Sequence, residues 1–211
     1  MTPQRIGIVG GSFNPIHIAH LIIADRFIEQ CALDTCIFVP AYQSPFKVGV
    51  RGHRDPTAQQ RFDMVKAATS LNARFDVSST EIDRGGVSFT IDTVREYHSA
   101  HPSAELYVLI GSDQAIEFVG WKDWQDICRM AQLCIVRRPF LLTHEMEVRT
   151  TERLSVDGRS PKWINAPLLE ISSTEIRDRV AAGQSVNYLT VKAVRDYISE
   201  HGLYSANNEA P

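Results

Sequence analysis

Two histidines, His17 and His20, stand three residues apart after a glycine turn, and their imidazoles could donate hydrogen bonds to phosphate oxygens. The turn spans residues 10–15, follows the apolar run 6–9 and precedes an apolar-periodic run over 21–28. We expect a strand, a turn and a helix in that order, with both histidines on one face of the first helical turn. Backbone N–H groups at such a helix N-terminus face an anion, so this stretch predicts a phosphate-binding loop.

Other chemistries suit these residues less well. Zinc needs three or four ligands, and no third ligand stands at a metal-like spacing, so we predict no metal site built by the protein. The dinucleotide fingerprint Gly-x-Gly-x-x-Gly is not met, and Val39-Pro40-Ala41 stands where a ribose-binding acid would be expected. A glycine turn without any ligand is the alternative for the loop taken alone.

Composition limits the class of protein. With 211 residues, 44% of them hydrophobic, the chain can bury one sizeable core, and we expect a single domain over 1–211 with a small C-terminal helical part at about 172–204. A net charge of −3 argues against a nucleic-acid partner. We find no signal peptide and no apolar run of membrane-spanning length, and therefore expect a cytoplasmic protein without a membrane partner. A homo-oligomer is left open.

The four cysteines form no Cys-x-x-Cys pair and sit in or beside apolar segments, so we expect buried thiols.

Strand-like runs alternate with helix-like segments, which predicts an open α/β fold with a parallel sheet. The strand-like runs are 6–9, 36–39, 75–78, 106–110 and 133–136. Ligands of such sheets bind at the carboxyl ends of the strands, where Lys47, Gly111-Ser112-Asp113 and Arg137-Arg138 fall. Residues 139–160 are polar and poorly periodic, and we interpret them as a variable loop without an assigned function.

Local patterns allow structural roles as well as ligand contacts. We expect Ser88 or Thr90 to cap a helix after Gly85-Gly86, Asp113 to be a helix N-cap or a ribose ligand, and Ser172 to form a capping box with Glu175. The indole of Trp121 is either core or a stacking surface for an aromatic ring. Arg61 and Met64 lie on a helix expected from near Thr57 and are interpreted as packing or surface residues.

Two motifs together indicate a family. The segment from Gly10 to His20 resembles the (H/T)-x-x-H motif of the nucleotidylyltransferase superfamily, and Ile171-Ser172-Ser173-Thr174-Glu175-Ile176-Arg177 resembles its second motif, Ile-Ser-Ser-Thr-x-x-Arg. Intermediate landmarks narrow the resemblance to the nicotinate-nucleotide adenylyltransferases, from Ile6 to Tyr204. Phe46 and Phe89 depart from the histidine and tyrosine usual in that family.

The resemblance implies a Rossmann-like open parallel sheet with helices on both faces. It also implies adenylyl transfer from ATP to nicotinate mononucleotide in NAD biosynthesis, with Mg²⁺ carried on the phosphates. The residues implied to be catalytic are His17, His20, Lys47 and Arg177. Those implied to bind ATP are Gly10, Gly11, Ser12, Phe13, His17, His20, Gly111, Asp113, Ser173, Thr174 and Arg177. Those implied to bind the acceptor are Asn14, Lys47, Ser88, Phe89, Thr90, Trp121 and Arg138.

Three alternatives stay open at this point. The acceptor could be nicotinamide mononucleotide or phosphopantetheine, or the fold could serve a non-catalytic nucleotide-binding module. An NAD-dependent oxidoreductase is the third alternative, although its fingerprint is missing.

Overall fold

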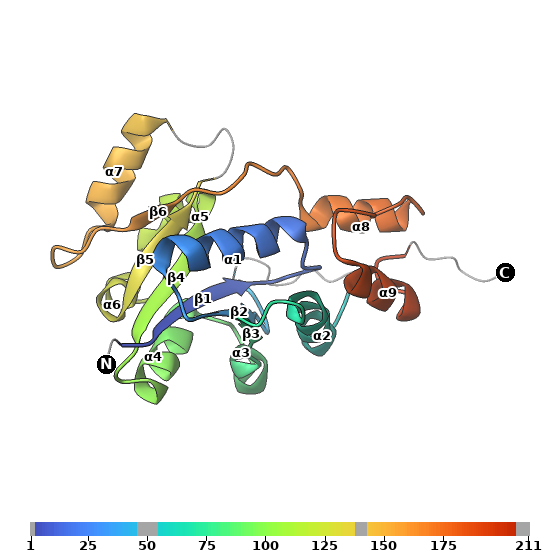
Figure 1. The fold of residues 1–211 in the computed structure, drawn as a ribbon, viewed down its shortest axis with the longest axis horizontal. Helices are drawn as coiled ribbons and strands as arrows, with labels where there is room; N and C mark the ends of the chain where they lie inside the picture. The colour runs from blue at the N-terminus through green and yellow to red at the C-terminus, as the bar shows by residue number, and fades with distance from the viewer. Residues whose placement is uncertain (1–2, 46–54, 138–142, 206–211) are drawn as a thin grey trace.

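The computed structural model describes residues 3–45, 55–137 and 143–205 (Figure 1). Phe46, Lys47 and Arg138 lie outside these ranges. The strands form one parallel sheet in the order β3-β2-β1-β4-β5-β6. Their bounds are β1 Arg5–Gly11, β2 Thr35–Pro40, β3 Phe75–Val77, β4 Glu105–Gly111, β5 Ala131–Val136 and β6 Lys162–Ile164. The predicted fold class is confirmed, and β6 is an addition to the five expected strands.

The helices cover both faces of this sheet (Figure 1). Their bounds are α1 Ile18–Cys31, α2 Ala58–Thr69, α3 Thr80–Arg84, α4 Thr90–Ala100, α5 Ser112–Glu117, the 3₁₀ turn η2 Phe118–Gly120, α6 Trp124–Met130, α7 His144–Leu154, α8 Ser173–Ala181 and α9 Lys192–Glu200. The helix expected near Thr57 begins with Thr57 as its N-cap residue.

Alternation along each strand divides the apolar side chains between two cores. Ile6 and Ile8 of β1 face α4, α5 and α6, whereas Val9 faces α1, α2 and α9. Gly7 lies on the second of these faces, where a Cβ would come within 2.5 Å of Leu33 Cδ1. The missing side chain therefore lets the chain after α1 pack closely on β1.

The prediction of a variable loop or short excursion over 139–160 is wrong for residues 144–154, which form α7, whereas residues 155–160 contain no helix or named strand. Helix α7 begins after Thr143, whose side chain accepts a hydrogen bond from Met146 N. Of the residues in α7 only Leu154 is buried, so a core-facing periodicity was missing from the sequence. Arg137 anchors the helix through an ion pair with Glu147, at 2.6 Å between Nε and Oε1.

All four cysteines are buried thiols, as expected. Cys31 Sγ and Cys134 Sγ lie 3.8 Å apart, between the end of α1 and β5. Within the described residues, no helix has both the length and the apolarity needed to cross a membrane.

Candidate active site

A cavity of about 520 Å³ opens at the carboxyl ends of β1 and β4. These adjacent strands are where the chain order reverses, since β2 and β3 extend the sheet on one side and β5 and β6 on the other. Such a switch point is the usual ligand crevice of an open parallel sheet. The predicted site residues that line the cavity are Gly10, Gly11, Ser12, Phe13, Asn14, His20, Ser88, Phe89, Thr90, Gly111, Asp113, Trp121 and Ser173.

His17 and His20 lie together at the start of α1, although the helix begins later than expected. His17 is the N-cap residue and His20 the third helical residue, and their rings stack at 3.7 Å between centroids. The backbone N–H of His17 donates to Nδ1 of His20 at 3.2 Å. In a neutral His20 the ring proton is then on Nε2, which makes Nε2 the donor of this ring.

The expectation that backbone N–H groups at the start of α1 face an anion needs correction. Ile18 N donates to Leu189 O and His20 N donates to His17 O, both at 3.0 Å. These amides are therefore engaged within the protein. Two of the first three amides of α1 are therefore not offered to an anion, whereas the helix macrodipole and the His20 ring are, and the chain from Gly10 to Asn14 lines the cavity directly.

The ring of Phe13 packs against the loop and against the start of α1. Its backbone has a φ of 44°, in the left-handed region, and its ring is buried edge-on to His20 at 5.2 Å between centroids. A Cβ on Gly11 would lie 3.0 Å from that ring, so glycine permits the close approach. The Phe13 ring thus fixes one side of the His20 imidazole.

The second motif reaches the first through hydrogen bonds. Ser173 Oγ donates to Pro15 O, Arg177 Nη1 to Asn14 O and Thr190 Oγ1 to Ile16 O, each at 2.8 Å. Three consecutive carbonyls of the loop are therefore held by the C-terminal part of the chain. Arg177 also donates to Thr174 Oγ1 at 3.1 Å, although neither residue is among those that line the cavity. Ser172 is the N-cap residue of α8 and its side chain accepts a hydrogen bond from Glu175 N, which confirms this half of the predicted capping box.

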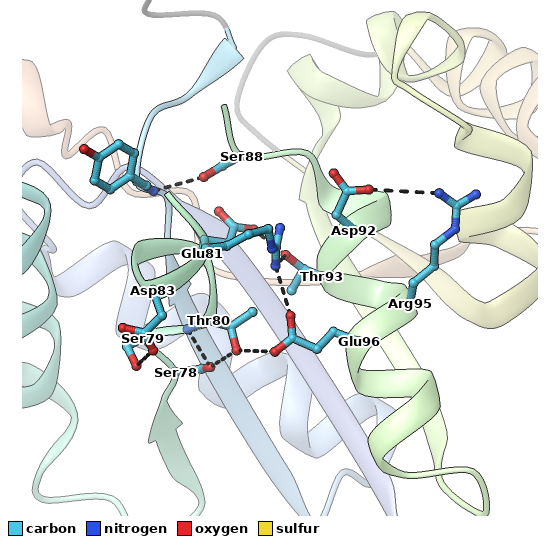
Figure 2. Close-up of polar contacts among 12 residues, drawn as sticks. Ser78, Ser79, Thr80, Glu81, Asp83, Ser88, Asp92, Thr93, Arg95 and Glu96 are labelled. Carbon is cyan, nitrogen blue, oxygen red and sulfur yellow. Dashed lines mark hydrogen bonds and ion pairs between the residues drawn. The ribbon is translucent and has the colours of Figure 1, made fainter. Parts of the chain in front are cut away.

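Ser88, Phe89 and Thr90 form the opposite wall, but the predicted cap is wrong. The N-cap residue of α4 is Phe89, and Ser88 Oγ instead accepts a hydrogen bond from Tyr42 N at 3.0 Å (Figure 2). Ser88 N donates in turn to Gln43 O. The serine therefore ties this wall to the chain after β2.

A buried, hydrogen-bonded pair of polar side chains stabilises this side of the cavity. Thr93 Oγ1 donates to the Glu81 carboxylate at 2.7 Å and accepts from Arg84 Nη2 at 3.2 Å (Figure 2). Arg84 also meets Glu96 at 3.3 Å. Glu81 and Thr93 line the cavity as well as bracing it.

Asp113 is not the N-cap of its helix. That position belongs to Gly111, whose N–H donates to Gln114 Oε1 at 2.9 Å, and Asp113 is the second residue of α5. A glycine without a side chain can be capped by a glutamine three residues on, so the aspartate is not needed for that purpose. Its carboxylate stands at the cavity wall, at the positive end of α5.

Trp121 packs against the core and also lies at the cavity, and its stacking on a ligand ring stays a prediction. Its partly buried ring packs on Phe118 at 5.0 Å between centroids and also lines the cavity. The next residue, Lys122, was missed from the sequence. Its ammonium lies 3.3 Å from the Asp92 carboxylate and 4.8 Å from the centre of the Phe89 ring, so it connects the segment of Trp121 to the start of α4.

Arg61 is buried rather than a surface residue, and Met64 is core. The guanidinium donates to the carbonyls of Ser12, Ala41 and Tyr42 at 2.7, 2.5 and 3.1 Å. It thus ties the loop after β1 to the chain after β2. The sequence signal that could have found it is a cation in the otherwise apolar series of buried positions along α2.

The cavity can hold a long polar ligand, because hydrogen-bond donors line one part of it and an aromatic ring lines another. Among the described residues, no group of three histidine, cysteine or acidic side chains could hold a metal ion.

Residues 8–179 match the model of the cytidylyltransferase-like family, and the chain belongs to that family. Within it, the chain belongs with the nicotinate-nucleotide adenylyltransferases. It is 38% identical over 208 residues to a probable nicotinate-nucleotide adenylyltransferase of Desulfitobacterium hafniense, covering 96% of both chains. It is also 38% identical over 204 residues to one from Moorella thermoacetica, covering 96% of this chain and 92% of the relative.

A solved structure shows the same fold. The nicotinic acid mononucleotide adenylyltransferase of Plasmodium falciparum, complexed with NaAD, matches 98% of this chain and all of its own, with a TM-score of 0.75 at 20% identity. The family match and the curated relatives confirm the resemblance inferred from the two motifs, and the solved structure confirms the fold.

Arg61 gives a test of how the loop is supported. Arg61→Met removes a buried cation from three carbonyls, and we expect the free energy of unfolding to fall by about 2–4 kcal/mol. Arg74→Met, at an exposed arginine, should change it by less than about 0.5 kcal/mol. Urea denaturation of both variants checks this, and equal stabilities would contradict the bracing role of Arg61.

Proposed function

We propose that this chain transfers the adenylyl group of ATP to nicotinate mononucleotide, giving nicotinate adenine dinucleotide and pyrophosphate in NAD biosynthesis. The observation that carries the proposal is the union of the two motifs at one cavity. Ser173 and Arg177 bond to the carbonyls of Pro15 and Asn14, and the loop so held lines the crevice beside His20.

The reaction needs positioning and charge stabilisation more than covalent chemistry. The acceptor phosphate attacks the α-phosphorus of ATP in line, and the bond to pyrophosphate breaks as the new P–O bond forms. His20 Nε2–H is the donor that would meet the phosphate oxygens as charge develops there, at the positive end of α1. His17 stacks on this ring and holds its orientation.

Phosphate charge needs further cations. Arg177 supplies a fixed guanidinium beside the loop, and Thr174 and Ser173 supply hydroxyls. Lys47 and Arg138 stay predictions for the same purpose, because both lie outside the described residues. Mg²⁺ would enter with ATP, bound to phosphate oxygens and water, since the described residues do not form a metal cage.

The acceptor would lie between the two walls. Trp121 offers an indole for the pyridine ring, and the start of α4 at Ser88, Phe89 and Thr90 faces it across the cavity. Asp113 is placed to accept hydrogen bonds from ribose hydroxyls. Together with a cytoplasmic location and no nucleic-acid or membrane partner, these assignments complete the proposal.

Initial rates with ATP and three acceptors test the function. We expect pyrophosphate release with nicotinate mononucleotide, and much slower release with nicotinamide mononucleotide or phosphopantetheine. A faster rate with either of the latter would reassign the acceptor, and no release with any of the three would favour a non-catalytic nucleotide-binding module.

His20→Ala removes the proposed donor to the α-phosphate. We expect kcat to fall by roughly 10²- to 10³-fold, as for the loss of one oxyanion donor, with little change in melting temperature. His98→Ala, at an exposed position of α4, is the matched control and should keep the wild-type kcat. Near-normal turnover of His20→Ala would remove this histidine from the mechanism.

Trp121→Ala separates stacking from packing, with Trp124→Ala as its control. Both indoles contact Phe118, but of the two only Trp121 lines the cavity. We expect both variants to melt earlier, and Trp121→Ala alone to raise KM for nicotinate mononucleotide roughly tenfold. An equal effect of both substitutions on KM would show that Trp121 acts only through packing.

A further inference from the structure

Tyr204 connects the C-terminal end of the described chain to the first motif. Its hydroxyl donates a hydrogen bond of 2.6 Å to Oδ1 of Asn14, 190 residues earlier. The other C-terminal contacts with this loop go to backbone atoms of Asn14, Pro15, Ile16 and Ile18, which any residue would offer. The bond from Tyr204 is different because it goes to a side-chain oxygen and therefore fixes the orientation of that side chain.

The tyrosine hydroxyl is built into the core rather than placed at its surface. Tyr204 is 7% exposed and its ring belongs to the apolar cluster formed by α1, α2 and α9. Burial raises the pKa of this hydroxyl well above its usual value, so it stays protonated and acts as a donor. A phenylalanine could fill the same space, which leaves the hydrogen bond as the contribution of the hydroxyl.

The backbone at Tyr204 is also unusual. Its φ is 60°, in the left-handed region that residues with a Cβ rarely adopt. A glycine would relieve this strain but would have no ring to reach Asn14. Strain retained at a residue that contacts a functional loop suggests that the placement of the side chain matters.

Asn14 is fixed from two directions. Arg177 Nη1 holds its backbone carbonyl at 2.8 Å and Tyr204 holds its side-chain oxygen. An amide whose oxygen is engaged presents its NH₂ group on the other side. Because Asn14 lines the cavity, the side chain can offer that NH₂ group as a donor to a phosphate oxygen.

We propose that Tyr204 is a positioning residue, which orients the Asn14 amide so that its NH₂ group donates to the phosphates in the cavity. This inference rests on the proposed adenylyl transfer for its kinetic test. It assigns to the C-terminal segment a part in the reaction beyond stability.

A double-mutant cycle tests the proposal, with Tyr204→Phe, Asn14→Ala and the double variant. We expect Tyr204→Phe to lower kcat/KM roughly two- to tenfold, the range for one hydrogen bond. Asn14→Ala should lower it further, and adding Tyr204→Phe to Asn14→Ala should have no further effect. Independent, multiplying losses would overturn the proposal, because the hydroxyl would then not act through Asn14.

Tyr197→Phe is the matched control for the loss of a tyrosine hydrogen bond. The Tyr197 hydroxyl donates to Asp63 Oδ2 at 3.1 Å and joins α9 to α2, away from the residues that line the cavity. It should lower the melting temperature about as much as Tyr204→Phe does, and leave kcat/KM unchanged. A Tyr204→Phe chain that is unfolded under assay conditions, or a Tyr197→Phe chain with the same kinetic loss, would make the role of Tyr204 structural only.

A readout independent of turnover keeps the two proposals distinct. In ¹⁵N–¹H spectra, the side-chain NH₂ signals of Asn14, assigned by their absence in Asn14→Ala, should show a single ordered orientation in the wild type. Tyr204→Phe should lower their order parameter, and Tyr197→Phe should not. Ordered signals in Tyr204→Phe would overturn the positioning role. A wild-type protein inactive with nicotinate mononucleotide would instead overturn the proposed function.

Discussion

The backbone polar groups of the loop from Asn14 to Ile18 find no hydrogen-bond partners within the loop. The rest of the site depends on the groups that bond to them instead. The carbonyls of Asn14, Pro15 and Ile16 have no strand or helix partner, and Pro15 and Ile16 are buried. A buried carbonyl without a donor is unfavourable by about 1–3 kcal/mol. Side chains from the C-terminal part of the chain provide the three donors, and in doing so they bring the second motif to the first.

The parallel sheet explains why this meeting happens beside a cavity. β1 and β4 are neighbours, and the connections that leave them run to opposite sides of the sheet. The chain therefore diverges above their carboxyl ends, and the space between can be filled by a ligand. Arg61 donates to the Ser12 carbonyl, Ser88 accepts from Tyr42 N, and Lys122 pairs with Asp92 over the Phe89 ring, so the segments around the cavity are tied to one another by side-chain contacts.

Much of this arrangement could be predicted from the sequence because it follows from local patterns. The five apolar runs predicted five of the six strands of the sheet. The two motifs, with their unusual residue types, indicated the family. What failed depends on which of several available partners a side chain takes. Ser88 was expected to cap a helix, but its side chain bonds to Tyr42 N. Asp113 was expected as an N-cap residue, but Gly111 holds that position and donates to Gln114. Helix α7 was hidden because only Leu154 of its residues is buried, and the contact of Tyr204 with Asn14 was hidden because nothing near Tyr204 in the sequence signals it.

The bonds between the C-terminal part and the motif loop also bear on the order in which the molecule can be assembled. A chain is made from its N-terminus at roughly 5–20 residues per second, so the partners of the loop follow it after a delay on the order of ten seconds. During that time β1 and α1 can form, but the carbonyls of Asn14 to Ile16 have only water as a donor. The motif loop is thus among the first parts to be synthesised and among the last to take its final shape. A nascent chain short of Tyr204 would hold most of its core and lack a completed motif loop.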